Sequence, residues 1–251
     1  MNAEEELLYK RFIELARKSD NGYFLFSDFL GLSEQSVFNE AKLKFGRAKY
    51  TLFGGIEGCE RVMVRFGDAE ELGYEEEFPI KILLIEPKAP KFADKLTHRD
   101  FLGAILNLGI ERKAIGDIVI INNSGYVFVN EDMADYVASS LERIKHTDVK
   151  TSIADELPSV ELFKTERKTI QLSGERIDAA ISKIYSISRD DSLSLFKKRL
   201  VFVCGKLCEN NSYTPKENDV ISVRGYGRFI YHGPISTSKK GKLNVEVELY
   251  V

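Results

Sequence analysis

The stretch SRDDSLSLFKKRLVFVCGK, residues 188–206, combines a helix start, a cluster of cations and a strand in immediate succession. Ser188 is a preferred residue at the N-cap of a helix, and the acidic side chains of Asp190 and Asp191 suit the positive end of the helix dipole. Residues 201–203 are apolar, with β-branched and aromatic side chains that favour a strand. The stretch therefore predicts a short helix that leads almost directly into a strand, with basic residues between them.

The cations of this region exceed what helix electrostatics explains. Three consecutive cations close the predicted helix: Lys197, Lys198 and Arg199. A helix C-terminus favours cations by about 0.3–1 kcal/mol each, which accounts for one or two of them but not for three followed by Lys206. Arg176 and Arg189 are expected at helix starts, where the same dipole disfavours positive charge. These positions predict contact with an anion, and the phosphate groups of a nucleic acid are the natural candidate.

The formal charge is divided unevenly along the chain. The 251 residues carry a net charge of −3, from 36 Lys and Arg against 39 Asp and Glu. Residues 174–251 hold 13 Lys and Arg against 9 Asp and Glu, a balance of +4, whereas residues 1–173 hold 23 against 30, a balance of −7. A basic C-terminal segment on an acidic protein indicates a local contact with a polyanion.

Length and composition describe an ordinary soluble protein of two or three domains, with 43% hydrophobic and 30% charged residues. No apolar run approaches the roughly 20 residues that cross a bilayer, and the acidic N-terminus is unlike a secretory signal. Cys204 and Cys208 lack a second close Cys/His pair, so we expect no zinc site. We expect a cytoplasmic protein without metal, cofactor or membrane contact.

The first segment, residues 1–77, predicts an α/β arrangement. Apolar residues at helical spacing indicate one face of an opening helix: Leu7, Leu8, Phe12, Leu15 and Ala16. A second helix is expected from Ser33, with four residues directed inward: Val37, Phe38, Ala41 and Phe45. Residues 50–67, YTLFGGIEGCERVMVRFG, predict two strands joined by a glycine-rich turn. The spacing of Gly54, Gly55 and Gly58 fits neither of the common phosphate-binding loops, so we interpret it as a tight turn.

The middle segment, residues 78–153, predicts the order βαββαβ, which is typical of ferredoxin-like folds. The run FPIKILLIEP indicates a strand that Pro87 stops, and THRDFLGAILNLG indicates a helix capped by Thr97 and Asp100. DIVIIN and GYVFV form the next two strands around a turn, NEDMADYVASSLERI a second helix, and HTDVKTSIA the last strand. An RNA-recognition-like domain is one interpretation of this order.

Two groups of residues in the middle segment suggest a secondary surface for RNA or a partner. Tyr126 and Phe128 resemble part of an RNP1 motif, and their spacing places both rings on one sheet face, where bases could stack. The first strand lacks the matching aromatic residue, so a covered, structural face is the favoured interpretation. His98 and Arg99 begin HRD, but the other kinase motifs are absent, so we interpret them as a partly exposed helix start.

The C-terminal segment, residues 174–251, follows a linker and leading strand over residues 154–173. A strand at 169–172 precedes a helix whose buried stripe is Ile177, Ala180, Ile181 and Ile184. Arg176 and Lys183, seven residues apart, share the opposite face of that helix. Leu193, Phe196 and Leu200 form the core face of the next helix, and a β-hairpin is expected to end the chain. The fold class of the whole chain is therefore α+β.

This segment resembles an S4 RNA-binding domain over about residues 174–230. The resemblance rests on Arg176-Ile177-Asp178 at a helix start, Ser188-Arg189, Val201-x-Val203-x-Gly205-Lys206, and residues 218–223, NDVISV. Two positions depart from the pattern, because Arg199 replaces the usual glycine before the strand and Cys204 replaces the usual asparagine before Gly205. The turn residues differ while the charge pattern is kept.

Most of the chain resembles the YlmH family, on the evidence of FGGIEGCERVMVRF, LTHRDFLGAILNLGIERKAIGDI and the terminal module with GYGRF. The resemblance implies a bacterial cytoplasmic protein of ribosome-associated quality control. Members are thought to hold peptidyl-tRNA on a split large subunit while a partner extends the stalled peptide with alanine. The family is also named in cell-division contexts.

Together these observations predict a monomeric, non-catalytic protein that binds rRNA and tRNA on the large ribosomal subunit, with a ribosomal or quality-control protein as a further partner. The RNA-binding residues are expected to be Arg176, Lys183, Ser188, Arg189, Lys197, Lys198, Arg199, Lys206 and Arg228. The alternatives are a cell-division-linked scaffold and an RNA-modifying enzyme. The latter follows from the similarity of residues 174–178, GERID, to the GRLD loop of pseudouridine synthases, with Asp178 as nucleophile, although the inserted Glu175 breaks that motif.

Overall fold

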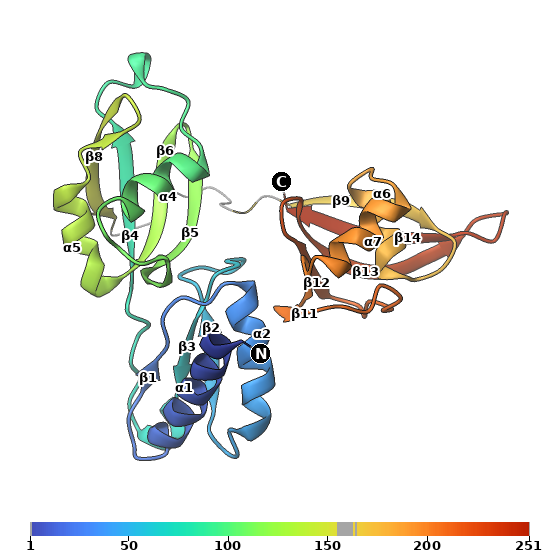
Figure 1. Cartoon of the computed structure of the whole chain (residues 1–251), viewed down its shortest axis with the longest axis horizontal. Helices are drawn as coiled ribbons and strands as arrows, with labels where there is room; N and C mark the ends of the chain where they lie inside the picture. Colours follow the sequence, from blue (N-terminus) through green and yellow to red (C-terminus); the bar gives the residue numbers. More distant parts are fainter. Residues whose placement is uncertain (1, 155–162, 164, 251) are drawn as a thin grey trace. The chain divides into compact units, whose positions relative to one another are not determined.

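A computed structural model describes residues 2–154, 163 and 165–250 of the chain. The chain divides into two compact units, one formed by residues 1–34 with 40–162 and the other by residues 35–39 with 163–251 (Figure 1). Several separate β-sheets with helices against them make this an α+β protein. No helix in the described part of the chain has the length and apolar character that a bilayer crossing requires.

The N-terminal part of the first unit packs helices beside a small antiparallel sheet of order β1-β3-β2. The elements in this stretch of the chain are α1 (Ala3–Ser19), β1 (Leu25–Phe26), α2 (Leu32–Ala41), η1 (Lys42–Lys44), β2 (Tyr50–Phe53), β3 (Met63–Phe66) and α3 (Ala69–Leu72). Residues 35–39 of α2 are the ones that belong to the second unit. The predicted helices and strand pair are confirmed, while β1 and α3 were not predicted. Phe12, Leu15 and Ala16 are buried as expected, but Leu7 is 72% exposed, because it lies off the helix face that Leu8, Phe12 and Ala16 share at four-residue spacing.

The middle part of this unit is a five-stranded antiparallel sheet of order β5-β6-β4-β8-β7. Its elements are β4 (Ile80–Pro87), η2 (Pro90–Phe92), α4 (His98–Leu106), η3 (Arg112–Ala114), β5 (Ile115–Ile121), β6 (Ser124–Asn130), α5 (Glu131–Ser140), β7 (Arg143–Ile144) and β8 (Thr147–Ala154). The second predicted helix ends at Ser140, earlier than expected, since Arg143 and Ile144 pair with β8 instead. Leu83, Ile85, Val127 and Val129 face the core that α4 and α5 complete.

Arg61 explains why these two parts form one unit. Its Nε donates to the Ile115 carbonyl at 2.8 Å, and its Nη2 donates to the carbonyls of Phe29 and Arg112 at 3.1 and 3.2 Å. The Asp117 carboxylate accepts the backbone N–H of Glu60 at 2.6 Å. Arg61 therefore links the glycine-rich turn of the first part to the sheet of the middle part, in a contact that the sequence did not reveal.

The glycine-rich turn is structural, as its spacing suggested. Gly55 has φ +108° and lies against the ring of Phe128, so a Cβ at this position would overlap that ring. A side chain on Gly54 would likewise meet Cys59. The turn needs glycine because it packs closely on the sheet.

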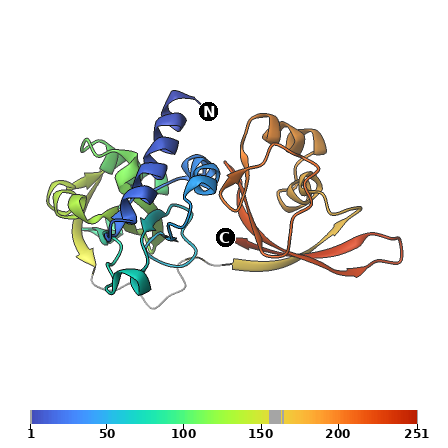
Figure 2. The same ribbon diagram turned by 90° about the horizontal axis from the view of Figure 1, so that it is seen from below.

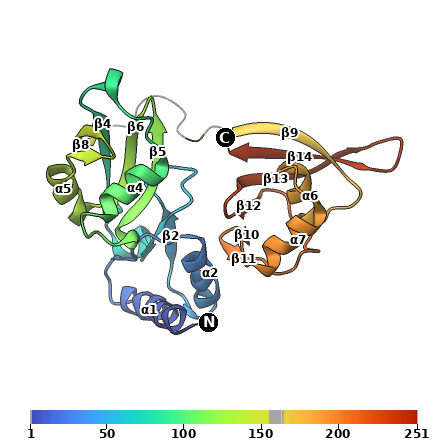
Figure 3. The same cartoon turned by 45° about the horizontal axis from the view of Figure 1, so that its top comes forward.

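The second unit is a six-stranded antiparallel sheet, and Figures 2 and 3 show both of its helices on one side of that sheet. The strand order is β11-β10-β12-β13-β14-β9. The elements are β9 (Thr165–Leu172), α6 (Ile177–Ile184), α7 (Arg189–Lys197), β10 (Val201–Val203), β11 (Lys206–Leu207), β12 (Asp219–Val223), β13 (Gly227–Thr237) and β14 (Leu243–Tyr250). Ile177, Ala180, Ile181, Leu195 and Phe196 bury the helices against the sheet.

Strand β9 is longer than the sequence indicated. It pairs with β14 from Thr165 to Leu172, whereas the expected strand began only at residue 169. Its first half, Thr165 to Lys168, consists only of polar residues that are mostly exposed on both faces, so no hydrophobic pattern marked it as a strand. The second unit therefore includes the whole strand that leads into α6.

Candidate RNA interface

The connection between α6 and α7 fixes the positions of their starts within the second unit. The Ser182 hydroxyl donates to the Ile187 carbonyl at 2.7 Å, and the Ile187 N–H donates to the Ser182 carbonyl at 3.1 Å. The fully buried Ser192 hydroxyl of α7 donates to the Asp178 carbonyl of α6 at 2.8 Å. These short bonds hold the first turns of the two helices side by side.

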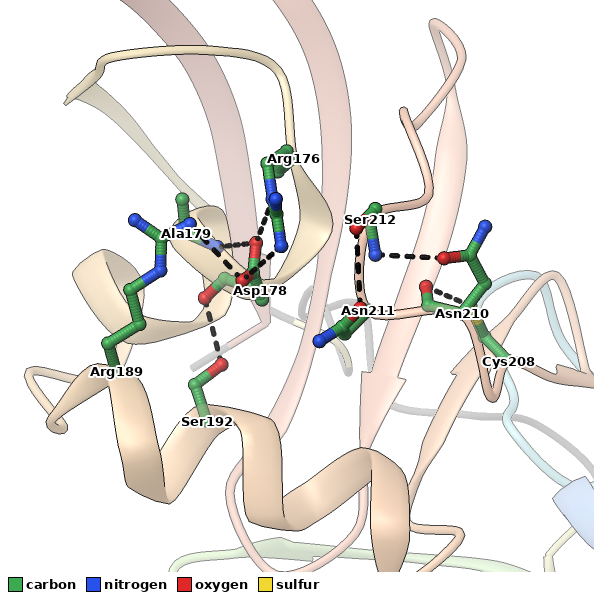
Figure 4. A network of polar contacts seen from close by, with 9 residues as sticks. All are labelled: Arg176, Asp178, Ala179, Arg189, Ser192, Cys208, Asn210, Asn211 and Ser212. Carbon is green, nitrogen blue, oxygen red and sulfur yellow. Dashed lines mark hydrogen bonds and ion pairs between the residues drawn. The ribbon is translucent and has the colours of Figure 1, made fainter.

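One buried carboxylate lies between Arg176 and Arg189, as Figure 4 shows. Arg176 donates to Asp178 through Nε and Nη2, both at 3.0 Å, and Arg189 donates through Nη2 at 3.3 Å. The Asp178 side chain is 0% exposed, whereas the side chains of Arg176 and Arg189 are 43% and 57% exposed. The carboxylate therefore orients two guanidinium groups whose remaining N–H donors face solvent.

The ionisation of Asp178 follows from these contacts. Burial alone would raise the pKa of its carboxyl, but hydrogen bonds and charge from Arg176, with Arg189 and the Ala179 N–H, lower the pKa below its ordinary value. Asp178 is thus ionised at neutral pH, and two arginines against one carboxylate leave a local charge of +1. The two arginines have a partner within the protein, which the sequence argument from helix electrostatics did not include.

The backbone N–H groups in the first turn of α6 already donate to acceptors within the protein. The N–H of Ile177 donates to the Tyr213 carbonyl at 2.9 Å, and the N–H of Asp178 donates to the Asn211 carbonyl at 3.4 Å. The Ala179 N–H donates to the Asp178 carboxylate at 2.9 Å. The backbone donors at the start of α6 are therefore not available to a phosphate, because the segment around Asn211 and the Asp178 carboxylate accept them.

The start of α7 is different. Ser188 is its N-cap, and its Oγ accepts the Asp191 N–H at 3.0 Å, as predicted. Neither Arg189 nor Asp190 has a backbone N–H partner within the described residues. The carboxylates of Asp190 and Asp191 lie in the same turn and oppose an anion there, so the side chain of Arg189 is the stronger phosphate ligand.

The remaining predicted cations of this unit are exposed. They are Lys183 on α6, Lys197 and Lys198 at the end of α7, Arg199 beyond it and Lys206 on β11. Arg199 makes a long contact of 3.8 Å with Glu209, and both side chains are exposed, so this pair contributes little to stability. Arg189 and Lys197 begin and end α7, roughly 12 Å apart at 1.5 Å per residue. The cations thus lie at both ends of this helix, with none between them.

Arg199 and Cys204 occupy left-handed backbone conformations, with φ of 57° and 47°. These are the two positions where the sequence lacks the usual glycine and asparagine, which adopt this conformation most easily. Arg199 and Cys204 are therefore expected to be strained at these positions.

Arg228 has a different environment from the one expected. Its guanidinium lies 3.8 Å from the ring centroid of Tyr250 and 5.2 Å from that of Phe163. The neighbouring turn presents Tyr226, which is 45% exposed and lies 5.4 Å from the ring of Tyr185. Tyr226 was not among the predicted residues, although its place between two arginines in RGYGR was a usable signal.

The predicted secondary surface divides into separate sites. Phe128 is 0% exposed beneath the glycine-rich turn, which confirms the structural interpretation for this ring, while Tyr126 is only partly buried. Partial burial, then the charge of Arg112, lowers the pKa of His98, so its imidazole is neutral at neutral pH. Arg99 lines a hollow of about 520 Å³ beside Arg143 and Lys145.

No group of His, Cys, Asp and Glu among the described residues could hold a metal ion.

Three comparisons place the chain among known proteins. The family model described as "Putative RNA-binding domain in YlmH" matches residues 74–156. The chain is 30% identical over 231 residues to the ribosome-associated protein quality control protein P2 of Bacillus subtilis strain 168, covering 88% of this chain and 86% of the relative. A solved structure, the cell division protein ylmH from Streptococcus pneumoniae, is 22% identical with a TM-score of 0.48, covering 61% of this chain and 93% of that one.

Proposed function

This chain belongs to the YlmH family, and on that premise we propose that it is a non-catalytic RNA-binding protein of ribosome-associated quality control. In this proposal it binds rRNA and peptidyl-tRNA on the large ribosomal subunit, in the bacterial cytoplasm. The relative from Bacillus subtilis carries the quality-control name, and the matched family model supplies the RNA-binding description.

The observation that carries the proposal is the pair of exposed guanidinium groups held by buried Asp178. Phosphate recognition requires donors in a fixed arrangement, and arginine offers a planar fork that matches phosphate oxygens. Asp178 uses three of the N–H donors of Arg176 and Arg189 and fixes the direction of the rest. The exposed lysines at the end of α7, Lys197 and Lys198, add electrostatic attraction without fixed geometry, as expected for contacts to a nucleic-acid backbone.

The fold supports the finer assignments. In the second unit, two short helices lie on one face of a sheet and are followed directly by β10, which is the arrangement inferred for an S4 domain. In the middle of the first unit, β5-β6-β4-β8 are the second, third, first and fourth strands of a βαββαβ chain, the basis for a ferredoxin-like assignment. We infer both domain types from these topologies.

The environment of Asp178 favours binding over catalysis. A nucleophilic carboxylate must reach its substrate, yet Asp178 is 0% exposed and accepts hydrogen bonds from Arg176, Arg189 and the Ala179 N–H. An rRNA-modification assay with purified protein should therefore detect no product. A modified base that appears only with the wild-type chain, and not with Asp178→Asn, would favour the enzyme instead.

The direct test is co-sedimentation with isolated ribosomal subunits at moderate salt. We expect the full chain to sediment with large subunits and not with small ones. A fragment starting at residue 163, which keeps β9 intact, should retain most of the affinity, and residues 2–154 should bind more weakly, as the charge balance of +4 against −7 suggests. If residues 2–154 bound as tightly as the full chain, the assignment to the second unit would be wrong.

A further inference from the structure

The connection between β4 and α4 presents an isolated aromatic ring to solvent. In Figure 1 this connection projects beyond the end of the five-stranded sheet in the first unit. Phe92, at the end of η2, is 91% exposed, more than any other large apolar side chain that the structure describes. Leaving a phenylalanine almost fully in water forgoes the stabilisation of about 1.5–3 kcal/mol that burial provides, so its exposure requires an explanation.

The connection is anchored at both ends, so the ring cannot be explained as part of a loose loop. At its start, the Lys88 N–H donates to the Asp148 carbonyl at 2.9 Å. At its end, the Asp94 N–H donates to the Thr147 hydroxyl at 2.9 Å, and the Asp94 carbonyl accepts from the Asn123 side chain at 2.8 Å. Pro90 and the bond from the Phe92 N–H to the Ala89 carbonyl, 3.1 Å, stiffen the tip between these anchors.

The charges around Phe92 indicate the kind of partner. Lys88, Lys91 and Lys95 are all exposed, and none has an ion-pair partner within the described parts of the chain. The carboxylate of Asp94 is turned inward, where it accepts the His146 N–H at 3.1 Å. Residues 88–95 therefore carry three cations against one carboxylate, although residues 1–173 have an overall balance of −7.

A single ring among cations suits RNA better than a protein or a membrane. A protein hot spot or a membrane-binding face needs a wider apolar area, whereas the residues beside Phe92 are lysine, proline and alanine. A nucleobase needs only one aromatic face, and the phosphates on either side of it need cations at short distances. The tip also lies inside residues 74–156, which match the RNA-binding family model.

We propose that residues 88–95 form a second RNA contact, in which Phe92 stacks on an unpaired base while Lys88, Lys91 and Lys95 neutralise the neighbouring phosphates. The proposal rests on the proposed function, in that the RNA belongs to the large-subunit complex. It adds a contact that does not involve the arginines of the second unit.

The experiment compares full-length variants in two binding assays, one with isolated large subunits and one with a fluorescein-labelled, mixed-sequence single-stranded RNA. Phe92→Ala should weaken binding about 5- to 150-fold, the range for loss of one stacked base. Phe92→Tyr should bind like wild type, and Phe92→Leu should fail like Phe92→Ala, because it keeps the apolar character but lacks a stacking face. Exchanging all three lysines for Gln should flatten the salt dependence by roughly 2 in slope.

Tyr23→Ala is the matched control, since Tyr23 is 64% exposed in the same unit but has no comparable cluster of lysines. Unchanged binding by Phe92→Ala would overturn the proposal, and so would full binding by Phe92→Leu, which would indicate an apolar protein pocket. If wild type did not bind large subunits, the proposed function would fail. The assay with labelled RNA would then be the test of the Phe92 contact. Equal binding of that RNA by wild type and Phe92→Ala, or no binding by either, would refute the contact.

Discussion

Arg176 bonds Asp178 through two parallel hydrogen bonds of 3.0 Å, so that an exposed cation at a helix start is tied to a carboxylate that water does not reach. This relationship gives Arg176 a structural role besides its proposed contact with RNA. It also changes what removal of the side chain should do, because a buried charge would lose its principal partner.

We expect Arg176→Ala to lower the free energy of unfolding by about 1–3 kcal/mol, the range for leaving a buried acceptor without its partner. Arg189→Ala should have a smaller effect, since Arg189 contributes one bond at 3.3 Å. Lys183→Ala, an exposed change on the same helix, is the control and should lie within about 0.5 kcal/mol of wild type. Urea unfolding monitored by circular dichroism measures all three. An unchanged midpoint for Arg176→Ala would show that Asp178 does not need this arginine.

The same carboxylate predicts a pH dependence. The pKa of Asp178 is lowered in the folded protein, so its stabilising effect is fully present above the ordinary carboxyl pKa of about 3.9 and is lost as the pH falls through the lower, folded value. Asp178→Asn should therefore melt below wild type at pH 7, and the difference between their melting temperatures should narrow below about pH 4. Thermal melts across pH 2.5–7 provide the check, and a gap that stays constant with pH would contradict the assigned ionisation.

The sequence predicted the elements that local residue patterns determine. It did not predict the elements that depend on contacts between distant parts of the chain. Thr97 and Ser188 begin their helices as their cap signals indicated. In contrast, β1, β7 and the first half of β9 are short or exposed strands whose pairing partners, not their own residues, define them. Arg61 binds three carbonyls from segments far along the chain, and no spacing within the sequence reveals that contact.

The sequence identified several residues of the candidate site but not how their side chains are arranged. Charge counting singled out Arg176 and Arg189, but the dipole argument treated both as unpaired, because it did not consider that Asp178, two residues from Arg176, would turn back to it. Arg228 was chosen for its charge, whereas its position near the rings of Tyr250 and Phe163 depends on how β13 meets β14 and the residue before β9 in space. Phe92 was missed because only the structure reveals its exposure.

A substitution at Arg199 can separate the effect of its charge on RNA binding from the effect of its backbone conformation on stability. Because its φ of 57° favours glycine, Arg199→Gly should raise the free energy of unfolding by about 0.5–1 kcal/mol while weakening RNA binding through the lost charge. Lys198→Gly is the matched control, since Lys198 has φ −82° and should gain no stability from glycine. Denaturant unfolding and RNA binding are measured on the same samples. A destabilised Arg199→Gly would contradict the assigned strain.

Phe128 and Tyr126 should respond differently to truncation. Phe128→Ala removes a fully buried ring packed against Gly55 and should lower stability by about 3–5 kcal/mol, while Tyr126→Ala, in a partly buried position, should lower it less. Neither change should alter RNA affinity at temperatures where the variant is folded. The measurements are thermal melting and filter binding. A Tyr126→Ala protein with wild-type stability and markedly weaker RNA binding would identify this sheet face as a stacking surface instead.

The most direct test of the central claim is the salt dependence of large-subunit binding by wild type, Arg189→Ala and Lys183→Ala, with melting curves recorded alongside. If the oriented arginine pair contacts RNA phosphate, Arg189→Ala remains folded, binds more weakly and shows a slope of log affinity against log salt that is smaller by about one phosphate contact. Lys183→Ala, which changes a cation without fixed geometry, should have a smaller effect. If Arg189→Ala co-sediments like wild type at every salt concentration, the arginines serve only to neutralise Asp178, and the second unit does not bind RNA through this surface.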